Sequence, residues 1–190
     1  IREAMRDNGN EGPLGGETET VEADETYVGG KQKNRATRKV RKKEAVVALV
    51  QRDGKVKGYH VANVNAATLK PILYKQIDRA TFLMTDESNV YTKAGQQFAA
   101  HGTVNHSIEE YVRGVFYHTN TVENYFSILK RGIVGVYHHV SPAHLKRYVG
   151  EFDFRYNTRK ITDGERADEA LIGAKGKRLT YRRTDQAALA

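Results

Sequence analysis

Hydrophobic and polar positions along the 190-residue chain follow two periodicities that predict its elements. Continuous or alternating apolar runs predict five strands, at residues 18–28, 44–51, 56–61, 81–85 and 102–106. Apolar residues at helical spacing predict a helix capped by Asn65, helices at 87–100 and 121–131, and one that begins with Ser141 and Pro142. An interior Pro71 should kink the first helix or move its start downstream. This order of elements indicates an α/β fold, a mixed sheet with helices packed against it.

Glycine and charge patterns divide the chain into three parts. The glycine-rich stretch 1–16 predicts a linker, residues 17–160 predict one folded domain, and 161–190 predict a basic C-terminal extension. The extension is less periodic and carries a basic cluster made up of Lys175, Lys177, Arg178, Arg182 and Arg183. A polar start without Met looks like the middle of a longer protein.

The stretch VEADETYVGG at 21–30 puts acids into a predicted strand. Side chains two residues apart share a face, so Glu22, Asp24 and Thr26 face one side and Glu25 faces the other. An ionised carboxylate on a half-buried strand is costly unless a cation or donor satisfies it. The strand is therefore a candidate metal-binding edge; the alternative is an exposed edge strand whose acids face water.

Two further acids can meet this strand. Asp86 ends the fourth predicted strand, which can lie beside the first, and Glu123 can reach the same edge from the helix at 121–131. Two aspartates and a glutamate offer hard oxygen ligands for two Mg²⁺ or Mn²⁺ ions rather than for zinc. Other acids are expected at the surface or behind the ligands, namely Glu22, Glu25 and Glu87.

One loop supplies the whole net charge of +8. Residues 31–43 hold eight basic residues and no acid, and the remaining chain has 23 basic and 23 acidic residues. The eight are Lys31, Lys33, Arg35, Arg38, Lys39, Arg41, Lys42 and Lys43. Such a run can neutralise nucleic-acid phosphates and release counterions. The alternative is a solvated loop without a partner.

Composition narrows the class of protein further. The chain has no Cys, which excludes disulfides and cysteine-ligated zinc within it, and no apolar run approaches the ~20 residues of a membrane span. The natural expectation is an intracellular protein without a membrane partner.

Several motifs together resemble one family. VEADETYVGG, TDES at 85–88, VNHSIEEYV at 104–112 and HTNTVENYFSILKRGIVGVYHHVSPAHLKRYVGEFDFRYNTR at 118–159 are similar to the catalytic domain of bacterial insertion-sequence transposases of the DDE class. The resemblance is to the family that usually carries a zinc-ribbon N-terminus. It implies a ribonuclease H-like fold and an acidic triad at Asp24, Asp86 and Glu123, with 36 residues between the last two.

The resemblance also implies roles for basic and polar residues near Glu123. Lys130 follows Glu123 by seven residues, two turns along the same helix face, where related transposases carry a basic residue. It is expected to take part in catalysis by holding a DNA phosphate beside the metals, and with Arg131 to bind DNA. Lys130 can equally be an ordinary surface lysine. His118 and Asn120 can orient Glu123 or touch DNA, or Asn120 can simply cap the helix.

The implied activity is metal-dependent cleavage and strand transfer of DNA by a homo-oligomer in the bacterial cytoplasm, at the nucleoid. The expected zinc ribbon and helix-turn-helix are missing upstream, so the sequence does not indicate which transposon ends or target would be recognised. Two alternatives remain open at this point. One is a non-catalytic nucleic-acid-binding protein with solvated acids, and the other is a stand-alone nuclease of the same fold.

Overall fold

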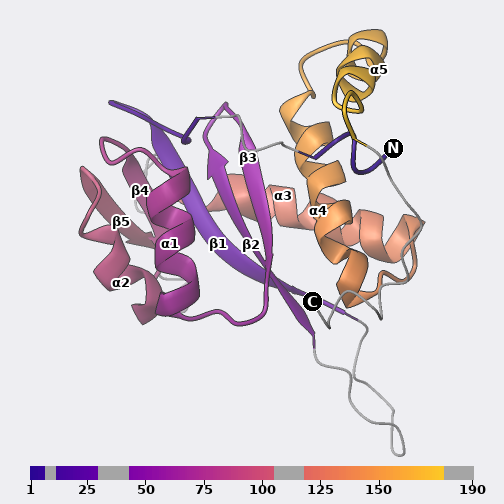
Figure 1. The fold of residues 1–190 in the computed structure, drawn as a ribbon. Coiled ribbons are helices and arrows are strands. Elements are labelled where there is room, and N and C mark those ends of the chain that lie inside the picture. Colours follow the sequence, from indigo (N-terminus) through magenta and orange to yellow (C-terminus); the bar gives the residue numbers. More distant parts are fainter. Residues whose placement is uncertain (7–11, 30–42, 105–117, 178–190) are drawn as a thin grey trace, which may run out of the picture.

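A single mixed sheet forms the centre of the molecule (Figure 1). The computed structural model describes residues 1–6, 12–29, 43–104 and 118–177. Within these ranges the sheet has five strands in the order β3-β2-β1-β4-β5. They are β1 (Thr20–Val28), β2 (Glu44–Gln51), β3 (Val56–Val61), β4 (Phe82–Asp86) and β5 (Ala100–Val104). The first three pair antiparallel, whereas β4 runs parallel to both β1 and β5. The central strand β1 therefore joins an antiparallel half to a parallel half.

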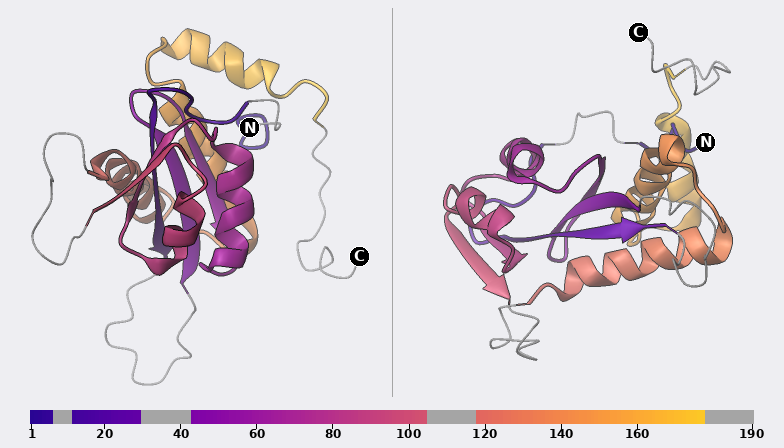
Figure 2. Two further views of the ribbon diagram at one scale, coloured as in Figure 1. Left: turned by 90° about the vertical axis from the view of Figure 1, so that its left-hand side faces the viewer. Right: turned by 90° about the horizontal axis from the view of Figure 1, so that it is seen from below.

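Helices cover both faces of this sheet (Figure 2). One face packs against α1 (Ala66–Gln76) and α2 (Asn89–Gly95), the other against α3 (Asn120–Arg131) and α4 (Pro142–Asn157). A π-helical turn, η2 (Gly132–Val136), follows α3 directly. The last described helix, α5 (Asp163–Ile172), lies outside these layers and buries none of its residues.

Strand β2 supplies core to both layers because its six central residues are all buried. Val46, Ala48 and Val50 pack against α3 and α4. Val47 and Leu49 point to the opposite side and pack against α1 and α2. A continuous apolar run is what a strand covered on both faces requires.

The order and direction of the strands, with helices on both faces, are those of the ribonuclease H-like arrangement. The α/β class and this fold, both expected from the sequence, are confirmed. The bounds of β2 and β3 match the predicted ranges, whereas β1 begins two residues later than predicted and β5 begins two residues earlier. Such shifts at element ends are ordinary.

For two helices the start or the end differs from the predicted one. Pro71 lies inside α1 and does not displace its start, which Asn65 caps by accepting from the Thr68 backbone N–H at 2.9 Å. Pro71 and Ala67 are both exposed, so water can satisfy the carbonyl that proline leaves unpaired. The predicted helix 87–100 ends at Gly95, because glycine weakens a helix and this one lies against the His101 ring.

The sequence reading missed α5, although its start signal is present. Thr162 and Glu165 form a capping box in which each side chain accepts from the other residue's backbone N–H. The predicted linker is also tied to the domain at several points, among them the two that follow. Leu14 is buried and bridges to Ile77, and Arg2 pairs with Glu151. The division at residues 16 and 160 stays a prediction.

Candidate active site

The parallel pairing of β1 with β4 places Asp24 beside Asp86. The ladder runs in register up to Ala23 opposite Thr85, and the two aspartates are the next residue on each strand. Side chains at matched positions of parallel strands point to the same face. That face is the one covered by α3, because Glu22, two residues before Asp24, bonds to the first turn of α3. Asp86 is the last residue of β4, at the carboxyl end where ligands of α/β sheets commonly bind.

Asp24 is in an environment that disfavours its charge. Burial raises the pKa of its carboxyl from the ordinary 3.8 to about 7, and the charges of Glu25, Asp86 and Glu123 add to the rise. The backbone N–H of Glu25 donates to the carboxylate at 2.7 Å and opposes the rise only in part. Asp86 and Glu123 are therefore close enough for their charges to act on Asp24.

Glu123 comes from the first turn of α3 and is exposed. The hydroxyl of Thr119, the capping residue just before the helix, donates to its Oε1 at 3.2 Å. Asp86 in turn accepts from the Ser88 backbone N–H at 3.1 Å. With the Glu25 N–H bond to Asp24, local backbone and side-chain donors thus orient all three carboxylates.

The three acids lie at one end of the sheet, but their carboxylates do not converge into a metal-binding cluster. Among the described residues, no group of three or more His, Cys, Asp or Glu side chains is arranged to hold a metal ion. Like charges repel one another when no cation lies between them. The structure brings Asp24, Asp86 and Glu123 to one neighbourhood, and their role as ligands stays a proposal.

The other residues that the sequence pointed to lie on α3, in the basic loop and next to Asp86. Lys130 and Arg131 lie in the last turn of α3, and both are exposed. Of the basic loop, Lys43 is described and exposed, and the other seven basic residues lie outside the described ranges. Glu87 is an exposed acid, as expected. Asn120 is the first residue of α3, while the capping position belongs to Thr119.

Sequence reasoning underestimated Glu22 and missed Arg52. Glu22 is fully buried, and the Nε of Arg52 donates to its Oε1 at 2.7 Å. His118 Nδ1 lies 3.2 Å from the same oxygen, outside hydrogen-bond alignment. The available signal was the alternation itself, which puts Glu22 on the face of Asp24 in a strand at the centre of the sheet.

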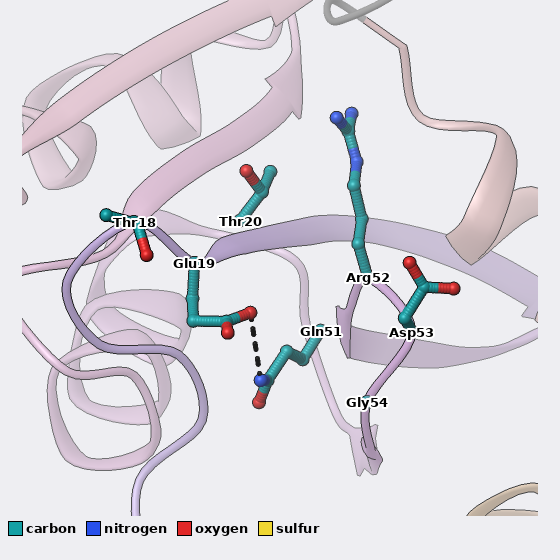
Figure 3. Close-up of a pocket in the computed structure, with 7 residues that line it drawn as sticks. All are labelled: Thr18, Glu19, Thr20, Gln51, Arg52, Asp53 and Gly54. Carbon is teal, nitrogen blue, oxygen red and sulfur yellow. Dashed lines mark hydrogen bonds between the residues drawn. The ribbon is translucent and has the colours of Figure 1, made fainter.

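Figure 3 shows a pocket of about 320 Å³ at the start of β1. It is lined by Thr18, Glu19, Thr20, Gln51, Arg52, Asp53 and Gly54. Gln51 donates to Glu19 across it at 3.2 Å. Thr20 lies four residues before Asp24, roughly 13 Å along a strand, so the pocket is separate from the acids.

None of the described helices is long and apolar enough to cross a membrane.

Comparison with known proteins identifies a family to which the chain is similar. Residues 13–157 match the model of the ISXO2-like transposase domain, and no curated protein matches the chain. Solved structures similar to it include the Mos1 transposase paired-end complex with the left transposon end, at 11% identity and TM-score 0.30, covering 82% of this chain and 55% of that one. A pre-cleavage Mos1 transpososome matches at 10% identity and TM-score 0.28, covering 85% of this chain and 57% of that one. The chain thus spans little more than half of either structure's chain. Because the family model covers most of its length, the chain belongs to the ISXO2-like transposase domain family.

Proposed function

We propose that the chain is the catalytic domain of a DDE-class transposase that cleaves DNA at the ends of an insertion sequence and joins them to target DNA. The observation that carries the proposal is the register of β1 and β4, which sets Asp24 beside Asp86 on the face of α3. Glu123 is near enough for its charge to raise the pKa of Asp24. Membership of a transposase family supports the same class of reaction.

The residues fit two Mg²⁺ or Mn²⁺ ions by their chemistry. Asp24, Asp86 and Glu123 offer hard carboxylate oxygens, and a cation between them would offset the burial and the like charges that raise the pKa of Asp24. When bound, a pair of such ions activates the attacking oxygen and stabilises the departing one. The contribution of the protein is to hold the three carboxylates at the carboxyl end of β4.

The reaction exchanges one phosphorus–oxygen bond for another in each of two steps. In the first, the oxygen of water bonds to the phosphorus at the end of the element, the bond to the 3′ oxygen breaks, and a free 3′-hydroxyl results. In the second, this hydroxyl bonds to a phosphorus of target DNA and displaces the 3′ oxygen there. Lys130 lies seven residues after Glu123, about 10 Å along α3, so it contacts DNA beside the acids rather than at them.

DNA affinity in this proposal comes from charge on two segments. Lys130 and Arg131 follow the site on α3, and the basic residues of the loop 31–43 neutralise backbone phosphates. Membership of a transposase family supports DNA as the partner. Processing two ends requires at least two copies, so we propose a homo-oligomer on DNA, acting in the bacterial cytoplasm at the nucleoid.

The test is a plasmid-nicking assay on the purified chain with Mg²⁺ or Mn²⁺. Asp24→Asn and Asp86→Asn should each abolish nicking and leave DNA affinity largely intact, because the acids serve chemistry and the basic segments serve binding. Glu87→Gln is the matched control, since it removes an exposed acid next to Asp86 and should nick like the wild type.

Two outcomes would overturn the proposal, and a third would limit it to DNA cleavage. If the aspartate variants nick as fast as the wild type, another group performs the chemistry. If the wild type binds DNA but cuts nothing with either metal, the chain is a non-catalytic binding protein. A labelled 3′-hydroxyl end that never joins to target DNA would indicate a nuclease instead.

A further inference from the structure

The buried carboxylate of Glu22 joins β1 to the start of α3. Its Oε2 accepts from the backbone N–H groups of Thr121 at 2.8 Å and Val122 at 3.0 Å. Its Oε1 accepts from Arg52 Nε at 2.7 Å and from the Thr121 hydroxyl at 3.0 Å. Both oxygens are thus fully used, each by two donors, on a side chain with no solvent exposure.

Glu22 binds the free backbone N–H groups at the start of α3, as the capping residue of a helix usually does. The free N–H groups in the first turn of a helix are commonly taken by the side chain of the capping residue. Thr119 is at that position in α3, but its hydroxyl makes no capping bond and donates to Glu123 instead. Because a residue of β1 caps α3, Thr119 can orient the Glu123 carboxylate.

Arg52 makes this arrangement possible and extends it. A buried carboxylate is strongly disfavoured without a partner, and the guanidinium supplies the compensating charge. Arg52 also donates through its terminal nitrogen to the backbone carbonyl of His118 at 2.8 Å. One arginine therefore holds both the carboxylate and the chain that enters α3.

We propose that Glu22, paired with Arg52, is a positioning residue that fixes the first turn of α3 against β1 and so sets Glu123 opposite Asp24. The same strand carries Asp24 and, two residues earlier, the cap of the helix that carries Glu123. The separation of Asp24 from Glu123 is therefore set by the short segment of β1 from Glu22 to Asp24. This inference rests on the proposed function, because it assigns Glu22 a role in the metal site.

Glu22→Gln tests it with little change of shape. In either orientation of the amide its NH₂ faces a donor, either Arg52 Nε–H or the two backbone N–H groups. Hydrogen exchange at Thr121 and Val122 should be about tenfold faster. The Mn²⁺ concentration for half-maximal nicking should rise about tenfold or more, as for other residues that orient metal ligands.

Glu151→Gln is the matched control. Glu151 is also buried and also pairs with arginines, Arg2 and Arg155, but it lies on α4. Its variant should lose stability and leave the Mn²⁺ requirement within about twofold of the wild type, because distant sites act independently. A Glu22→Gln protein that folds and keeps the wild-type Mn²⁺ requirement would overturn the inference.

A second variant decides the matter if Glu22→Gln does not fold. Thr119→Val removes the hydroxyl that holds Glu123 and keeps the shape, so it should raise the Mn²⁺ requirement, and Thr119→Ser should restore it. An unchanged requirement in Thr119→Val would then overturn the inference. Titration calorimetry with Mn²⁺ separates the two proposals. A wild type that neither binds Mn²⁺ nor nicks DNA sinks the proposed function, whereas an active wild type with indifferent variants sinks only the role of Glu22.

Discussion

The hydroxyl of Tyr91 donates a 2.7 Å hydrogen bond to the carboxylate of Glu25, on the face of the sheet opposite Asp24. Burial raises the pKa of Glu25, the bond from Tyr91 lowers it, and the charge of Asp86 raises it again. Strand β1 is thus held on both faces at two residues that are three apart, by α2 through Glu25 and by α3 through Glu22.

Tyr91→Phe should therefore destabilise the domain. The change leaves a half-buried carboxylate without its tyrosine donor, which costs about 1 kcal/mol of unfolding free energy. Urea denaturation at pH 7.5 measures the loss. Tyr27→Phe is the control on the same strand, because that tyrosine is 52% exposed and its loss should be close to neutral. Equal stability of the two variants would show that the Glu25 bond contributes nothing.

The raised pKa of Asp24 predicts how stability depends on pH. The unfolded chain releases this proton near its ordinary pKa of 3.8 and the folded chain near 7, so between these values the folded state binds more protons. Stability should fall as pH rises through that window and level off above it. Asp24→Asn lacks this titration and should exceed the wild type by on the order of 1–4 kcal/mol above pH 7. Denaturation curves from pH 4 to 9 measure the difference, which should shrink toward pH 4. A difference independent of pH would contradict the assignment.

Gly58 in β3 is expected to tolerate no side chain. A Cβ there would meet Val149, Asp153 and the hydroxyl of Tyr125. Tyr125 donates to Asp153 at 2.6 Å, and the Gly58 N–H donates to the same carboxylate at 2.9 Å, so the contact joins β3, α3 and α4. Gly58→Ala should cost about 1–3 kcal/mol by overpacking.

The same substitution at Gly164 is the control for that measurement. Gly164 lies in exposed α5, and a Cβ there meets nothing within 4 Å. Gly164→Ala should be neutral or stabilise by up to about 1 kcal/mol, because alanine favours a helix. Thermal unfolding of the two variants should move in opposite directions or differ clearly in size.

The basic loop makes a prediction about salt. Replacing four of its basic residues by Ala, at Lys33, Arg35, Arg38 and Lys39, should weaken binding alike for unrelated DNA duplexes. The slope of log affinity against log salt should flatten by roughly 0.9 for each lost phosphate contact. Fluorescence anisotropy at several salt concentrations on two duplexes provides both numbers. An unchanged slope, or a loss on one duplex alone, would show that the loop is not a general phosphate contact.

The fold was predictable where local pattern and long-range packing agree. The run 44–51 is largely apolar because both faces of β2 are covered. The turn at Asp53 and Gly54 then reverses the chain, so that β3 pairs antiparallel with β2. The expectation that the first and fourth strands can lie side by side is confirmed by the pairing of β1 with β4. Pro71 was misjudged because the cost of an interior proline depends on solvent at that face of the helix, which periodicity does not report.

The candidate site was predictable for its acids but not for the groups that orient them. Asp24, Asp86 and Glu123 are recognisable by residue type, order and resemblance. Arg52 sits in a hairpin turn, where a basic residue normally faces water, and only the tertiary structure turns it toward Glu22. At the start of α3 the capping bonds go to Glu22 of β1, and Thr119 at the capping position bonds to Glu123 instead. No local sequence pattern signals this arrangement.

The buried pair of Glu22 and Arg52 has a consequence for how related sequences can diverge. Removing either partner alone leaves a charge in the interior without compensation, whereas replacing both together by apolar residues of similar volume removes that penalty. Substitutions at positions 22 and 52 should therefore occur in pairs across the family. Relatives that lack the glutamate should lack the arginine too, and in those sequences a side chain next to the start of α3 must take over the capping of that helix.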